Sequence, residues 1–264
     1  MLGRLIKYDF KSTFRSLLPL CAAFIVVGAL AGLSIPDFDA KTAPPTVIVV
    51  LWGTIMFALV ALTVAVSIIS MIIVITRFYK NLLGSEGYLS FTLPVSAKMH
   101  LTSKCISGYV EFAIAFLSGI ISYGLFLLIA VARVGNLINF KKVFEELAAL
   151  IVNVDAPYAV FFILTALAGT FQALIKIYFS MMLGHQSEDH KILMSFVGYI
   201  VISIIEATIE HIISIIFLGV SFISETTDVV SLGYLIMTFV ITMIFNIVYV
   251  IGTYYLMNNK LNLE

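Results

Sequence analysis

Apolar residues form six long runs along this chain, separated by short segments in which charged residues, prolines and glycines accumulate. A helix that crosses roughly 30 Å of hydrocarbon needs about 20 predominantly apolar residues, and each run reaches that length. The pattern therefore predicts an all-α integral membrane protein with six transmembrane helices, over Leu17–Ile35, Val47–Ile75, Cys105–Ala132, Tyr158–Leu183, Ile192 onward and Leu232–Met257.

Composition agrees with this pattern. Hydrophobic residues make up 61% of the 264 residues, charged residues only 11%, and the mean hydropathy is +1.11. We therefore expect a multi-pass protein of the plasma membrane, organised as a single domain over residues 1–264, rather than a soluble protein. The zero net charge argues against nucleic-acid binding. The two cysteines, Cys21 and Cys105, fall within or at the start of predicted spans, so no disulfide framework is expected.

The distribution of positive charge predicts the orientation. With six spans both termini lie on the same side of the membrane. Of 15 lysines and arginines, only Lys41, Arg133, Lys141 and Lys142 then fall on the opposite side. Because cytoplasmic segments of membrane proteins are enriched in Lys and Arg, we expect both the N-terminus and the C-terminus in the cytoplasm.

In the first 16 residues, basic and apolar residues recur with the spacing of an α-helix. The basic residues share one face and leucines, isoleucine and phenylalanine the other, with Asp9 on the apolar side. This pattern predicts an interfacial amphipathic helix. The alternative is a cleavable signal peptide, because Ala29–Ala31 resembles a cleavage site. The long basic region favours the interfacial helix. A second amphipathic segment, residues 133–157, is expected on the outer surface.

The most informative polar segment is Thr76–Lys104, between the second and third apolar runs. It carries four basic residues against the single acid Glu86, so it is expected on the cytoplasmic side. Helical spacing of Phe78, Tyr79, Leu82 and Leu83 predicts an amphipathic turn at the membrane surface. Glycines then permit a sharp backbone reversal, and Ser96 is placed to cap a new helix that runs into the third span.

This order of parts, a basic amphipathic N-terminus, two spans, a loop reading EGYLSFTLPVS and a restarting helix, resembles the membrane subunit of an ABC-2 type exporter. The similarity is greatest to the permeases of Gram-positive peptide-export systems. It covers the N-terminal helix, the loop and the number of spans. The alternative is an ordinary cytoplasmic loop with a helix cap.

The resemblance implies a coupling helix in this loop that docks on a separate cytoplasmic ABC ATPase subunit. ATP and Mg would be bound by that ATPase, with no cofactor on this chain, and a second permease copy or homologue would complete the transporter. Amphipathic or antimicrobial peptides, or similar amphipaths, would be exported. The residues expected to couple the permease to the ATPase are Tyr79, Leu82, Leu83, Gly84, Glu86, Gly87, Tyr88 and Phe91.

Motifs for catalysis are absent from the sequence, which has no nucleotide-binding loop, no H-E-x-x-H and no G-x-S-x-G. We therefore do not expect this chain to be an enzyme. The segment Gly184–Lys191 contains two histidines and two acids, which are possible metal ligands. Without a second cluster to close a site, a solvated loop is favoured and no metal is expected.

Charges inside the spans are the remaining candidates, because each is costly in hydrocarbon and usually faces a partner or a cavity. Glu111 and Lys176 lie at matched depths on opposite-running helices, which predicts a structural ion pair; the alternative is a substrate contact. Glu206 and Glu210 lie one turn apart with His211 adjacent, and no cationic partner is evident within the membrane. We therefore expect these three residues to line a substrate path.

The fifth apolar run is too long for one span. From Ile192 to Ser224 it would measure roughly 50 Å as a helix, so we expect the span to end near His211. Ile212–Ile223 is then expected to fold back as a re-entrant segment, as the resemblance also implies. Two other functions stay open: a proton-coupled secondary transporter that uses Glu206, Glu210 and His211, and a membrane protein that transports nothing.

Overall fold

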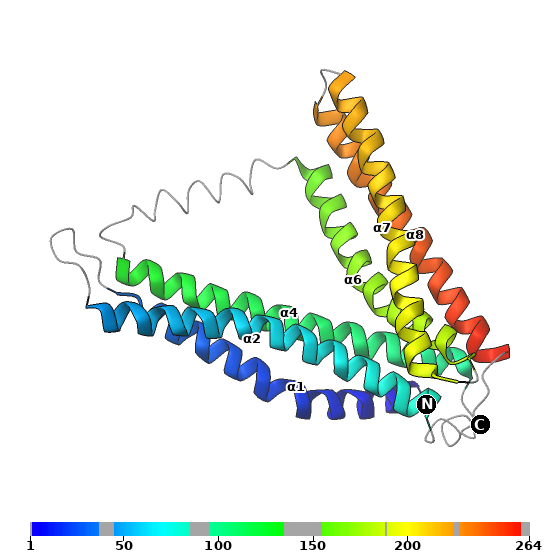
Figure 1. The fold of residues 1–264 in the computed structure, drawn as a ribbon, viewed down its shortest axis with the longest axis horizontal. Helices are drawn as coiled ribbons and strands as arrows, with labels where there is room; N and C mark the ends of the chain where they lie inside the picture. The colour runs from blue at the N-terminus through cyan, green and yellow to red at the C-terminus, as the bar shows by residue number, and fades with distance from the viewer. Residues whose placement is uncertain are drawn as a thin grey trace. The chain divides into compact units, whose positions relative to one another are not determined.

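The structure, a computed structural model, describes residues 2–36, 45–84, 96–134, 155–187, 189–223 and 227–259. Within these ranges the chain is helical and contains no strand. Six helices are long and apolar enough to cross a membrane, which confirms the six predicted spans. They are α1 (Leu2–Leu33), α2 (Thr46–Phe78), α4 (Ala97–Val134), α6 (Ala156–Gly184), α7 (Lys191–Ile223) and α8 (Thr227–Asn259) (Figure 1).

Local sequence explains where two of these helices, α6 and α4, begin. Asp155 occupies the N-cap of α6 and a proline follows in its first turn, where the missing N–H costs nothing. α4 begins one residue after Ser96, whose carbonyl accepts the first backbone hydrogen bonds from Met99 and His100. The predicted helix restart at Ser96 is therefore confirmed.

The fifth span differs from its prediction. α7 continues as one helix of 33 residues from Lys191 to Ile223, so the expected re-entrant segment over Ile212–Ile223 is wrong. That stretch has no proline and only one glycine, Gly219. An apolar stretch without a helix breaker keeps its backbone groups bonded by continuing the helix, whereas a fold-back would leave them unsatisfied at membrane depth.

The N-terminal segment is continuous with the first span. α1 runs without interruption from Leu2 to Leu33, so the amphipathic residues and the apolar residues belong to one helix. Its polar face is exposed at Lys7, Lys11 and Arg15. Asp9 lies on the buried face, as its position on the apolar side predicts. The predicted outer segment 133–157 lies mostly outside the described residues.

The helices are distributed over two compact units. One comprises Met1–Leu5, Ile75–Tyr109 and Val154–Glu264, and the other comprises Ile6–Val74 and Val110–Asn153. We call them the α6–α8 unit and the α1–α2–α4 unit. The single permease domain over residues 1–264 stays a prediction.

In the α1–α2–α4 unit, glycines of α1 let this helix approach α4 closely. A Cβ atom on Gly28 would collide with the backbone and side chain of Ser122, and one on Gly32 would lie 2.8 Å from Ile129. Ser122 also donates a hydrogen bond of 2.8 Å to the carbonyl of Phe24. Small residues at such crossings allow the backbone contact that holds membrane helices together.

The α6–α8 unit is built around the second half of α6, which packs against both α7 and α8 (Figure 1). Tyr178 is its central side chain, at 2% exposure. Its ring stacks on Phe78 with 4.1 Å between centroids, and its hydroxyl donates to the carbonyl of Lys104 at 3.1 Å. The end of α2 and the start of α4 are therefore anchored on α6.

Candidate functional site

A buried polar cluster joins the three long helices of the α6–α8 unit. Glu206 on α7 is its centre, with 6% of its surface exposed. One carboxylate oxygen accepts from the Gln172 amide at 2.9 Å and from the Tyr249 hydroxyl at 2.6 Å. The other oxygen lies 2.6 Å from the Lys176 ammonium. We call these four residues the Glu206 cluster.

Helix geometry places these groups together. Gln172 and Lys176 are four residues apart on α6 and so share one face. The Lys176 ammonium also lies 5.1 Å from the centre of the Tyr199 ring, and Tyr199 is two turns before Glu206 on α7. The lysine is therefore held by a carboxylate and by an aromatic face of the same helix.

Charge compensation is complete within the Glu206 cluster. A carboxylate that accepts three hydrogen bonds, one from a cation, recovers much of the desolvation cost of burial. The expectation that Glu206 has no cationic partner is therefore wrong, because Lys176 from the neighbouring helix supplies one. The sequence alone predicts that Lys176 pairs with Glu111 instead. Glu111 is buried at 1% exposure in the α1–α2–α4 unit, and that pairing stays a prediction.

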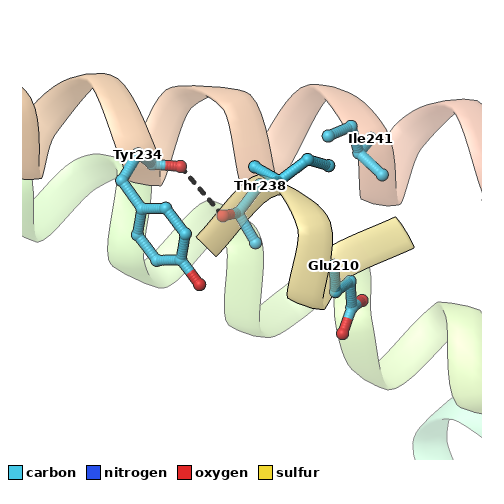
Figure 2. Close-up of a pocket in the computed structure, with 5 residues that line it drawn as sticks. Glu210, Tyr234, Thr238 and Ile241 are labelled. Carbon is cyan, nitrogen blue, oxygen red and sulfur yellow. Dashed lines mark hydrogen bonds between the residues drawn. The ribbon is translucent and has the colours of Figure 1, made fainter. Parts of the chain in front are cut away.

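Glu210 has a different environment although it is one turn beyond Glu206. Its side chain is exposed and lines a small pocket on the α7–α8 pair. Figure 2 shows Glu210 on α7 beside the side chains of Tyr234 and Thr238, which come from α8. Ile213 and Ile241 complete the lining.

The three residues of the predicted substrate path are thus not brought together as one site. Glu206 is committed to the buried cluster and Glu210 to the pocket. His211 is exposed on α7 and does not line this pocket. Sequence spacing could not separate the two acids, because residues four apart share a face of α7. Glu206 is bonded to side chains of both α6 and α8, whereas Glu210 is exposed beside α8.

The predicted coupling segment begins with a π-helical turn, η1 (Tyr79–Leu83), which continues α2. Leu82 and Leu83 are only 1% and 5% exposed, so their side chains pack within the chain. The Tyr79 ring contacts His185 edge to face at 6.5 Å between centroids, and the Gly84 N–H donates to the Tyr79 carbonyl at 2.7 Å. The proposed partner contacts Glu86, Gly87, Tyr88 and Phe91 lie outside the described residues.

This burial changes which side chains a partner could reach at the turn. Lys80 is exposed, and Tyr79 and Asn81 are half-buried. At the start of α4, the Lys98 ammonium lies 5.2 Å from the centre of the Tyr254 ring of α8. The accessible part of the turn is therefore basic and polar rather than apolar.

Comparison with known proteins adds no relative. No protein-family model, no curated protein and no solved structure matches this chain. Within the described ranges, no group of three or more His, Cys, Asp or Glu side chains is placed to hold a metal ion. In the part of the chain that the structure describes, the Glu206 cluster and the Glu210 pocket are candidate sites that rest on geometry.

Proposed function

We propose that this chain is the membrane-spanning permease subunit of an ATP-driven ABC exporter, with both termini in the cytoplasm of a cell whose plasma membrane it crosses six times. A separate ABC ATPase subunit would bind ATP and Mg, and a second permease copy or homologue would complete the path. The exported compounds would be amphipathic or antimicrobial peptides, or similar amphipaths. Six candidate spans and the resemblance of the Thr76–Lys104 segment to a coupling loop support this proposal.

The observation that carries the proposal is the length of the two helices that flank this segment. The candidate span Thr46–Leu83 contains 38 residues, and α4 also contains 38. At 1.5 Å per residue each measures roughly 57 Å, almost twice the hydrocarbon thickness of about 30 Å. Since the basic residues lie at the connected ends, the excess length would carry the segment into the cytoplasm, within reach of a soluble partner.

Packing of these ends suggests how a partner could act on the permease. Phe78 on α2 stacks on Tyr178 of α6, and the Tyr178 hydroxyl bonds the backbone of α4 at Lys104. Tyr178 is half a turn beyond Lys176 of the Glu206 cluster on the same helix. A displacement of the turn by a docked ATPase would therefore be transmitted to α6, and through Lys176 and Glu206 to α7.

Association with an ATPase is the decisive test. The tagged chain would be purified in mild detergent from its native membrane, and co-purifying proteins would be identified by mass spectrometry. We expect an ABC ATPase in stoichiometric amount, and we expect Lys80→Glu to reduce its recovery several-fold. Lys7→Glu, the same charge reversal at an exposed position of α1, is the matched control. A chain that purifies without an ATPase in its native membrane, while remaining folded, would contradict the proposal.

A second candidate function is a proton-coupled secondary transporter. The Glu206 cluster favours it, because ionisable side chains within membrane spans mark ion pathways and proton relays. Such a carrier would move substrate in proteoliposomes driven by a pH gradient alone. The ABC exporter would require ATP and its partner under the same conditions, so one transport assay separates the two.

A further inference from the structure

The α7–α8 pocket is small and has one charged wall. Its volume is about 40 Å³, which exceeds the roughly 10–15 Å³ that a cavity needs to hold one water molecule. Two isoleucines, Ile213 and Ile241, form apolar walls, and Glu210, Tyr234 and Thr238 supply the polar atoms. In Figure 2 the Tyr234 ring and the Glu210 carboxylate lie on either side of Thr238.

The Glu210 carboxylate is uncompensated within the described part of the chain. The nearby cation Lys176 is taken by Glu206 at 2.6 Å, and no described residue forms an ion pair or hydrogen bond with Glu210. An ionised carboxylate in a membrane-spanning helix is costly unless a cation or water meets it. The pocket is therefore suited to a ligand that brings a positive charge.

The other polar atoms restrict the kind of cation. The Thr238 hydroxyl donates its hydrogen to the Tyr234 carbonyl at 2.8 Å, so its oxygen is left as an acceptor. The Tyr234 hydroxyl and the carboxylate provide further acceptor oxygens. A primary ammonium group has three N–H donors and no acceptor, which matches this set of acceptors.

We infer that the Glu210 pocket binds the primary ammonium group of an amphipathic ligand, whose apolar chain would follow the exposed isoleucines of α7. The inference rests on the proposed export function for the identity of the natural ligand. Two sources share this chemistry: the lysine side chain or N-terminus of a peptide, and the headgroup of phosphatidylethanolamine. Glu206 takes no part in this binding, because its carboxylate is already occupied.

A thermal-stability assay with a defined probe tests this site. Dodecylammonium would be titrated into the purified protein in neutral detergent, and the unfolding midpoint recorded. Because a ligand that binds only the folded state stabilises it, we expect a rise of several degrees for the wild-type chain and little or none for Glu210→Gln. Dodecyltrimethylammonium carries the same charge on a larger head without N–H donors, and should give a much smaller rise.

Matched variants keep the test specific. Thr238→Val removes an acceptor of the pocket and should weaken the response, whereas Thr208→Val makes the same change at an exposed position of α7 outside the pocket and should leave it intact. Equal shifts for the wild type and Glu210→Gln, or no shift for either, would overturn the inference.

Two further titrations distinguish the sources. A lysine-containing amphipathic peptide that gives a Glu210-dependent shift identifies an exported ligand, and phosphatidylethanolamine that does so, compared with phosphatidylcholine, identifies a lipid headgroup. Either result supports an ammonium site. The ATPase co-purification and the thermal-shift assay test different claims. A chain that purifies without an ATPase but still binds dodecylammonium would contradict the proposed function and leave the ammonium site supported.

Discussion

The Lys176 ammonium lies 2.6 Å from the Glu206 carboxylate and joins α6 to α7 inside a bundle of candidate membrane spans. Both side chains are largely buried, at 15% and 7% exposure. Around them, Gln172 and Tyr249 satisfy the second carboxylate oxygen, so the pair is part of a network that also includes α8. This network connects α6, α7 and α8 through side-chain hydrogen bonds.

Removal of one member of this pair should destabilise the protein strongly. Lys176→Met or Glu206→Leu leaves an uncompensated buried charge, which typically costs about 3–5 kcal/mol. The double variant removes both charges and should cost less than the two single changes together. Free energies of unfolding in mild detergent, combined in a double-mutant cycle, measure the coupling; strictly additive values would show that the pair contributes nothing.

The pairing of Glu111 with Lys176, predicted from their depths in the sequence, is measurable in the same way. A coupling free energy clearly above the usual additivity error of about 0.3–0.5 kcal/mol would support it. Additivity within that margin, alongside coupling between Lys176 and Glu206, would reject it. Glu111→Gln retains the shape of the side chain and is the appropriate single change.

Tyr178 contributes through both its ring and its hydroxyl. Tyr178→Phe removes only the hydrogen bond to the Lys104 carbonyl and should cost about 1 kcal/mol. Tyr178→Ala also removes the stacking on Phe78 and leaves a cavity, so we expect about 3–5 kcal/mol. Unfolding measurements on the two variants separate the terms. If both cost the same, the ring contributes little, contrary to its central position.

Glycine substitutions should have opposite effects at two helical positions. Gly28→Ala places a methyl group against Ser122 and should destabilise the protein, since the two helix backbones must move apart. Gly53 on α2 has no neighbouring atom within 4 Å of such a methyl group. There, the higher helix propensity of alanine should stabilise by up to about 1 kcal/mol. Thermal unfolding of the two variants compares the signs directly; destabilisation by both would mean that contacts other than the α1–α4 approach limit these positions.

The spans themselves followed from the sequence alone. In hydrocarbon a backbone must satisfy its own hydrogen bonds, so long apolar runs become helices whatever their neighbours are. The restart of α4 after Ser96 was predictable for a second local reason, the preference of serine for the N-cap position of a helix. Backbone hydrogen bonding also explains why the re-entrant prediction for Ile212–Ile223 is wrong, because a long apolar run without a helix-breaking residue continues as a helix.

Only the tertiary structure decided which charges meet. At 1.5 Å per residue, Lys176 lies roughly 12 Å from the end of α6 at Gly184, and Glu206 lies roughly 22 Å from the start of α7 at Lys191. A comparison of depths along the two helices therefore does not predict this pair. Two long side chains reaching toward each other cover the difference, and they do so only because α6 and α7 pack together. Partner choice depends on helix packing and side-chain reach, which involve residues far apart in the chain, whereas hydropathy is a local property of each segment.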